Sequence, residues 1–221
     1  MCIGQEKVEE KSNETTAIPK LLDSLDISDA VVSIDAIGTQ TKIAGRIIDQ
    51  KGHNLLSVKG NRQGLLEDVE HAFRLNKGTV FTNETESNHG RIETRQCSIL
   101  PAKDYLLEEY LQAWKQVATL IKIEASRDIN GALHQQTRYY ISDEHVEQAA
   151  CYNSLIRGHW GIENHLHWHL DVTFKEDACR ARVGNAPLNL SILSIIRKFA
   201  LQLLSNIKDK HSLKKDNIRQ R

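Results

Sequence analysis

A strand–helix–strand pattern near the beginning of this sequence constrains its fold more than any other feature. The run Ala30–Asp35 is short, apolar and β-branched, which is typical of a strand buried in a parallel sheet. Thr41–Asp49 then has helical spacing of its apolar residues and is closed by Gly52, before a second strand over Asn54–Val58. This β-α-β unit predicts an α/β protein, with Asp35 at the carboxyl end of the first strand.

Two further helices are expected beside this unit. Ser12 or Asn13 predicts the cap of a helix over Ala17–Leu25, and Pro19 restricts the start of that helix to its own position or near it. Asn61 predicts the cap of a third helix, which runs to about residue 73.

After the third helix the pattern changes to short segments typical of antiparallel strands. These segments are Gly78–Thr82, Gly90–Leu100, Leu120–Ser126 and Gln136–Ser142, with a helical stretch around Tyr105–Gln116 between them. We therefore expect residues 76–142 to form a β-rich insertion. It separates a partial core, residues 1–75, from a helical part of the core, residues 143–206, and a basic tail follows over residues 207–221.

The segment Arg157–Asp171 predicts a helix that carries a functional site. His159 and His167 lie four residues to either side of Glu163, so the three side chains project from one helical face. Such a face can hold a metal ion or a phosphate. Taken without further context, a helical glutamate is more often a solvated residue.

The histidines and tryptophans of this segment leave alternatives open. The histidines are His159, His165, His167 and His169. Two of them turn to other faces and no cysteine lies at ligand spacing, so surface or DNA-facing histidines are favoured over a zinc site. Trp160 and Trp168 could stack on bases at a DNA end, but packing in the core is favoured for both.

Composition bounds the class of protein. Lys plus Arg equals Asp plus Glu at 29 each, so nucleic-acid binding would depend on local patches of charge. The four cysteines are far apart and no signal peptide is evident, which predicts a reduced, cytoplasmic protein. The longest apolar stretch, Leu188–Leu204, is interrupted by polar residues and predicts an amphipathic helix, so no membrane partner is expected.

Six blocks of sequence resemble one family in their order along the chain. They are Lys11–Glu14 with Ala17–Pro19, Ile34–Ala36 with Gly38 and Gln40, Lys59–Asn61, His89–Arg95, Tyr139–Ser142, and His159–Asn164 with Phe174–Asp177. Together they resemble the H-repeat-associated group of bacterial DDE insertion-sequence transposases, over nearly the whole chain. The resemblance implies a ribonuclease H-like, integrase-like fold. In that family, two Asp and one Glu hold two Mg²⁺ (or Mn²⁺) ions for attack on a DNA phosphodiester.

The resemblance assigns roles to three residues of this chain. Asp35 corresponds to the second catalytic Asp and Glu163 to the catalytic Glu, and both are expected to bind metal. His159 stands where related transposases have an Arg, as a phosphate or hydroxyl contact. Without the family, Asp35 would more often be a turn or cap residue.

The first catalytic Asp of the family belongs to an Asp-Gly-Lys motif on the opening strand, and this chain has no such motif. We therefore expect an amino-terminally truncated transposase whose core lacks its first strands and which does not transpose DNA alone. The alternative is a non-catalytic protein that binds DNA or inhibits an intact transposase. Expected partners are the DNA ends of an insertion sequence and a second copy of the chain or an intact transposase.

Several cations are candidates for weak DNA contacts. They are Lys59, Arg91, Arg95, Arg157, Lys175, Arg180 and Arg182. Arg91, Glu93 and Arg95 alternate along one expected strand and so share a face that could follow a DNA backbone. Solvated ion pairs between strands explain the same pattern equally well. The basic tail could hold DNA non-specifically, although a disordered end is the favoured interpretation.

Overall fold

The computed structural model describes residues 6, 14–87, 91–129, 132–145, 147–162, 180, 184–186 and 189–197. The chain forms two units, one of Val8–His159 and one that joins Met1–Lys7 to Trp160–Arg221. In the second unit residues 189–197 are helical, inside the stretch predicted as an amphipathic helix. No helix within the described part of the chain is long and apolar enough to cross a lipid bilayer.

One six-stranded mixed sheet organises the unit Val8–His159, which confirms the predicted α/β class. Its strands lie in the order β1 (Val31–Ile34), β2 (His53–Val58), β6 (Ala132–Ser142), β5 (Thr119–Ile129), β4 (Arg91–Pro101) and β3 (Thr79–Ser87). Strand β1 is parallel to β2, and every other neighbouring pair is antiparallel. The ribonuclease H-like assignment stays an expectation from the family.

The predicted β-α-β unit is present as β1, helix α2 (Thr41–Asp49) and β2. Helix α2 forms because its apolar residues recur on one face, and Ile43 and Ile47 of that face are fully buried. They pack with Leu22 and Ile27 into a small core. One expectation was wrong: all four residues of β1 are only half-buried, because this strand stands at the end of the sheet order rather than inside it.

Two expected helix starts were also wrong. Helix α1 (Glu14–Asp23) contains Pro19 in its interior, so the helix begins before the proline and the Pro19 nitrogen donates no hydrogen bond. Helix α3 (Gln63–Leu75) is preceded by the 3-10 turn η2 (Gly60–Arg62), so Asn61 does not cap it. The Asn61 amide instead donates to the carbonyl of Ala36, at 2.6 Å.

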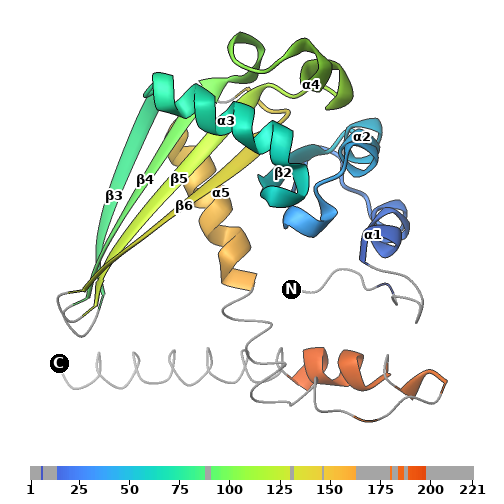
Figure 1. Cartoon of the computed structure of the whole chain (residues 1–221). Helices are drawn as coiled ribbons and strands as arrows, with labels where there is room; N and C mark the ends of the chain where they lie inside the picture. Colours follow the sequence, from blue (N-terminus) through green and yellow to red (C-terminus); the bar gives the residue numbers. More distant parts are fainter. Residues whose placement is uncertain are drawn as a thin grey trace, which may run out of the picture. The chain divides into compact units, whose positions relative to one another are not determined.

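The four strands predicted between residues 76 and 142 are all present, and three of them, β3, β5 and β6, are longer than expected. They form the antiparallel meander β3–β6, and β6 pairs with β2 through contacts such as Leu56 with Ile141. The predicted insertion therefore continues the sheet of the core. Figure 1 shows the far ends of these strands reaching beyond α3. The expected helix at Tyr105–Gln116 is shorter, and is observed as α4 (Glu108–Ala113) after the 3-10 turn η3 (Ala102–Asp104).

Helices cover both faces of the sheet (Figure 1). On one face, Leu65, Val69 and Phe73 of α3 pack on strand residues such as Leu56 and Leu120 in the main core. Each fully buried side chain of this size contributes about 1.5–3 kcal/mol. On the other face lies α5 (Ala149–Ile162), the helix that carries His159, with Tyr152 and Ile156 fully buried.

Candidate active site

Asp35 and Lys59 meet at one edge of the sheet because β1 and β2 are parallel. Each residue directly follows its strand, and the carboxyl ends of parallel strands lie at the same edge. Lys59 Nζ lies 3.2 Å from Asp35 Oδ1, and the two side chains are 51% and 48% exposed. The pair is therefore open to a ligand from solution.

The environment of Asp35 favours its ionised form. Burial by itself raises the pKa of Asp35. Three neighbours oppose burial: the backbone N–H of Ala36, Lys59 through its hydrogen bond and charge, and the charge of His159. Their combined effect is larger, so the pKa of Asp35 lies below its ordinary value. Asp35 is thus a carboxylate at neutral pH. Its oxygens are donors of the kind that Mg²⁺ and Mn²⁺ prefer.

The turn after β1 is held in place by packing and by hydrogen bonds to β2. Residues Ala36–Gly38 form the 3-10 turn η1, which Asp35 begins in an extended conformation. A Cβ on Gly38 would lie 2.5 Å from Ile34 Cγ2, so only glycine fits there. Thr39 follows the turn, and its hydroxyl donates to the carbonyl of Ser57 on β2, at 2.7 Å. These contacts fix where the Asp35 carboxylate lies.

His159 reaches the same strand from α5, far away in the sequence. Its Nδ1 is hydrogen-bonded to the hydroxyl of Ser33 at 3.0 Å, and Ser33 lies two residues before Asp35. The structure thus brings together Asp35 and His159, two of the residues that the sequence singled out.

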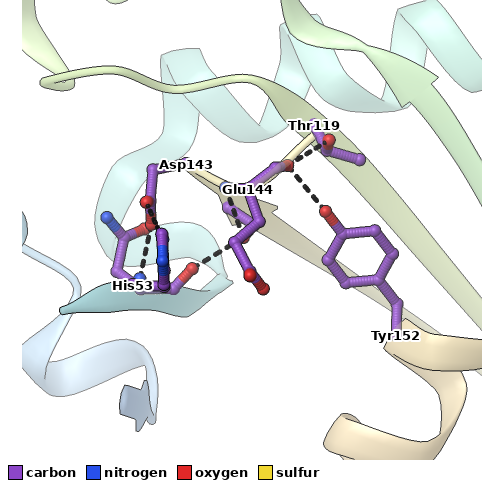
Figure 2. Close-up of polar contacts among 7 residues, drawn as sticks. His53, Thr119, Asp143, Glu144 and Tyr152 are labelled. Carbon is purple, nitrogen blue, oxygen red and sulfur yellow. Dashed lines mark hydrogen bonds and ion pairs between the residues drawn. The ribbon is translucent and has the colours of Figure 1, made fainter. Parts of the chain in front are cut away.

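Polar contacts join the connection between β6 and α5 to the neighbouring strands, as Figure 2 shows. Asp143 lies 2.8 Å from His53 Nδ1 and also accepts the backbone N–H of Asn54, so the connection is joined to β2. The carbonyl of Glu144 accepts hydrogen bonds from Thr119 on β5, at 2.6 Å, and from Tyr152 on α5, at 2.7 Å. Helix α5 is therefore attached to β2 and β5 at its start.

A second anchor holds α5 to the sheet near its middle. Arg95 of β4 is 9% exposed and its Nε donates to the Asn153 side chain at 3.0 Å. Burial lowers the pKa of Arg95, and the nearby charges of Arg157 and Arg138 act in the same direction. Arg95 therefore holds α5 to β4 through this buried hydrogen bond.

A groove of about 540 Å³ opens beside the Asp35–Lys59 pair. Its lining comes from α1, η1, the start of α2 and η2: Thr15, Ala36, Ile37, Gln40, Lys59, Asn61 and Arg62. Arg62 is oriented by the hydrogen bond from its Nε to the carbonyl of Thr39, at 3.1 Å, and by the ring of Trp114, which lies 5.9 Å from its guanidinium carbon. Within the part of the chain that the structure describes, the lining thus has two cations and no acidic residue.

Comparison with known proteins decides the family. A family model described as "Transposase DDE domain" matches residues 2–196. The chain belongs to this transposase family. YncI of Escherichia coli O157:H7, whose name includes the word transposase, is 40% identical over 214 residues, covering 94% of this chain and 54% of that protein. The H repeat-associated protein YhhI of Escherichia coli K12, also named with that word, is 37% identical over 216 residues, covering 94% and 56%.

These comparisons confirm the resemblance to the H-repeat-associated transposases. They also show that the chain spans about half the length of the curated relatives it matches. The shared sequence includes the Asp35 turn and the Lys59–Asn61 segment, which both fall inside the matched residues.

The other predicted site residues are placed as follows. Glu163, Lys175 and Arg182 lie outside the described residues, as do His165, His167, His169 and Trp168. Arg157 is an exposed residue of α5, and Arg91 begins β4. Arg180 belongs to the second unit and Trp160 is half-buried.

In the described ranges, no three His, Cys, Asp or Glu side chains are grouped to hold one metal ion. Of the predicted metal ligands, Asp35 alone is a described residue.

Two residues at the site were missed by the sequence analysis. Ser33 is a polar residue inside an apolar strand, which is a signal that could have drawn attention to it. Arg62 directly follows the Lys59–Asn61 block and therefore lies at the same strand edge. The partner of Ser33 could not have been found locally, because 126 residues separate it from His159.

Proposed function

We propose that this chain is part of a DDE transposase, with Asp35 and Glu163 as ligands of the catalytic divalent cations. The observation that supports it is the ionised Asp35 at the carboxyl end of β1, with Lys59 at 3.2 Å. Mg²⁺ or Mn²⁺ ions, two in the intact family, would supply activation of the attacking oxygen and stabilisation of the leaving oxygen in phosphodiester cleavage. Asp35 fits this role because it is ionised and open to solution.

The neighbours of Asp35 have roles in holding DNA. Lys59 is proposed to contact a phosphate once a cation takes its place as the partner of Asp35, because a cation and an ammonium compete for one carboxylate. His159 is proposed to contact a phosphate oxygen with its imidazole ring, which Ser33 holds through Nδ1. Arg91, Arg157 and Arg180 remain proposed backbone contacts further away, and so do Lys175 and Arg182.

A polypeptide of these 221 residues is proposed to be incompetent in strand cleavage and transfer. The family requires three carboxylates, whereas the sequence offers Asp35 and Glu163 and contains no Asp-Gly-Lys motif. A metal site with a missing carboxylate binds its ions weakly and holds them in the wrong place. Activity then requires a third carboxylate from outside these residues, such as one of an intact transposase.

A second candidate function is DNA binding without cleavage, which would make the chain an inhibitor of an intact transposase in the cytoplasm. The cations beside Asp35 favour it, because phosphate binding by Lys59 and Arg62 does not depend on a third carboxylate. The two candidates share DNA as the partner and differ only in chemistry.

Binding of the purified chain to duplex DNA with insertion-sequence ends tests the proposal. Fluorescence anisotropy with Mg²⁺ present, across a range of salt concentrations, should show that affinity falls with salt. Lys59→Gln should reduce the slope of that dependence by about 1, because one phosphate contact is lost. The control Lys115→Gln, at a half-exposed lysine paired with Asp49, should leave the slope unchanged.

The same samples test for cleavage. Incubation with Mg²⁺ should produce no nicked DNA. Nicks made by the wild-type chain and absent with Asp35→Asn would contradict the proposed incompetence and would support Asp35 as a catalytic ligand. The absence of any salt-dependent DNA binding would contradict both candidate functions.

A further inference from the structure

Asn61 joins two turns that follow neighbouring strands of the sheet. The pairing of β1 with β2 ends at Ile34 and Leu56, and the turns η1 and η2 come after it. The side-chain amide of Asn61, on η2, crosses to η1 and donates to the carbonyl of Ala36, at 2.6 Å. A hydrogen bond between the two turns therefore continues the connection beyond the last strand pair.

Ala36 is the residue through which this bond reaches Asp35. The backbone N–H of Ala36 donates to the Asp35 carboxylate. The carbonyl of Ala36 accepts the Asn61 amide and also the backbone N–H of Thr39, at 3.1 Å. Ala36 is only 7% exposed, so it cannot turn away from either neighbour without disturbing close-packed atoms. Asn61 thus holds the residue whose N–H binds the carboxylate.

The same bond sets the spacing of the Asp35–Lys59 pair. Asp35 directly precedes η1 and Lys59 directly precedes η2. Asn61 is the middle residue of η2, and Ala36 is the first residue of η1. Because the bond joins the two turns so close to the pair, it determines how far Lys59 Nζ lies from Asp35 Oδ1, which is 3.2 Å.

The exposure of Asn61 separates this role from a role in overall stability. Its side chain is exposed and lines the groove, whereas Thr39, which donates to Ser57 from the same region, is fully buried. Water can replace an exposed hydrogen bond when it is broken, so its net contribution to the folded state is small. The consequence of losing it is expected in the turn beside Asp35.

We propose that Asn61 is a positioning residue for Asp35. By holding Ala36, it keeps the Asp35 carboxylate in one place beside Lys59, where a divalent cation can bind it. The inference rests on the proposed function, because it names a residue that orients the carboxylate assigned there as a metal ligand. In this role Asn61 contacts neither the cation nor DNA.

Carboxyl ¹³C spectra of the full ¹³C,¹⁵N-labelled chain test the proposal in EDTA, without metal. The Asp35 side-chain signal, identified by its loss in Asp35→Asn, should move in Asn61→Ala, because the Ala36 N–H is no longer held against the carboxylate. The backbone amide of Thr39 should exchange with solvent about fivefold faster, since one hydrogen bond that fixes its acceptor is lost.

Asn76→Ala is the matched control. The Asn76 amide also donates to a main-chain carbonyl, that of Ala72 at 3.2 Å, but at the end of α3. This variant loses a bond of the same type and should leave the Asp35 signal and the Thr39 exchange unchanged. An Asp35 signal that stays in place in Asn61→Ala, or that moves as far in Asn76→Ala, would overturn the proposal.

Mn²⁺ distinguishes positioning from a merely structural contact. In Asn61→Ala, the Mn²⁺ concentration that half-broadens the Ala36 amide signal should rise about fivefold, the effect of one ordinary hydrogen bond. Urea unfolding should show similar stability for Asn61→Ala and Asn76→Ala. If Asn61→Ala moved the Asp35 signal but left the Mn²⁺ requirement unchanged, Asn61 would shape the turn without positioning a ligand, which would contradict the inference.

Failure here is distinguishable from failure of the proposed function. A wild-type chain without local broadening by Mn²⁺ would contradict the metal role of Asp35. The spectra in EDTA would still decide whether Asn61 positions that carboxylate, because they require no metal ion.

Discussion

Gly38 determines how closely the turn after β1 can approach the rest of the core. A Cβ at this position would meet Ile34 Cγ2 at 2.5 Å and Ile18 Cδ1 at 2.8 Å. Such distances are shorter than atoms in a packed core tolerate, so a larger residue must push the turn or the strand away. The position of Asp35 therefore depends on a residue that does no chemistry.

Gly38→Ala should destabilise the chain by about 1–3 kcal/mol, because the added methyl group overpacks the core. Urea unfolding followed by circular dichroism measures the change. The matched control is Gly45→Ala in α2, where an added Cβ meets nothing within 4 Å. That control should stabilise the chain by about 0.5–1 kcal/mol, since alanine is the better helix former. A Gly38→Ala variant as stable as Gly45→Ala would contradict the packing described for the turn.

His53 makes the stability of the unit depend on pH. The hydrogen bond that His53 donates to Asp143 raises the pKa of His53 against the opposing effect of burial, and the charges of Asp143, Glu144 and Asp29 add to it. A pKa raised in the folded state means that the stabilisation is fully present below the unfolded value of about 6.5. It is lost as the pH rises through the folded pKa.

The difference in unfolding free energy between the wild type and His53→Gln should therefore be largest at acidic pH and should shrink at alkaline pH. The effect should be about 1 kcal/mol or less, because the imidazole is 39% exposed and water screens the pair. Urea unfolding at several pH values measures it. A difference that grows with pH would have the wrong sign for this interaction.

Helix α5 is the element on which the geometry of the site most depends, because it carries His159 to β1. The buried pair of Arg95 and Asn153 joins its middle to β4. Asn153→Ala would leave a buried guanidinium without this acceptor, so the variant should be less stable by about 1–3 kcal/mol. The exposed neighbour change Ser154→Ala should be within about 0.5 kcal/mol of wild type. Equal stability of the two variants would show that the buried pair does not hold the helix.

Cys97 reports on whether α5 covers the sheet. It is fully buried, and burial raises its pKa to about 12. Cys151 on α5 is exposed. Iodoacetamide should alkylate Cys151 in the folded chain and should reach Cys97 only on unfolding, because the thiolate is the reactive form. Peptide mass spectrometry distinguishes the two sites, and rapid native labelling of Cys97 would contradict the packing.

Local pattern predicted the elements better than it predicted their partners. The β-α-β unit was predictable because apolar spacing in Thr41–Asp49 and the closing Gly52 are local signals. The Asn61 cap was wrong because that amide bonds to the Ala36 carbonyl, a contact between segments 25 residues apart. The half-buried state of β1 likewise depends on its place at the end of the sheet, which the apolar run does not encode.

The positions of the candidate site residues were predictable from local pattern, but their catalytic roles came from the family. The pattern put Asp35 at a strand end and His159 on a helix face, and the structure places both near one strand. Nothing in the spacing of the sequence could pair Ser33 with a histidine 126 residues away, or place Arg62 in a groove with Thr15. Contacts of this kind exist only once the sheet and α5 have packed.

For the molecule as a whole, the arrangement of charges accounts for the proposed binding of DNA by a chain with equal numbers of acidic and basic residues. Among the described residues, the groove is lined by Lys59 and Arg62 and by no acidic side chain, next to the carboxylate proposed to receive a divalent cation. In the proposed complex, local charge rather than net charge attracts the phosphates. A cation on Asp35 would release Lys59 from its ion pair.

Paramagnetic relaxation by Mn²⁺ on the full ¹⁵N-labelled chain tests the proposed metal site most directly. Low concentrations of Mn²⁺ should broaden the backbone signals of residues around Asp35, including Ala36, before others. Asp35→Asn should abolish that local broadening. Asp49→Asn, at an aspartate that is 66% exposed and paired with Lys115, should leave it intact. Equal broadening in the wild type and in Asp35→Asn would show that Asp35 is not a metal ligand in this chain.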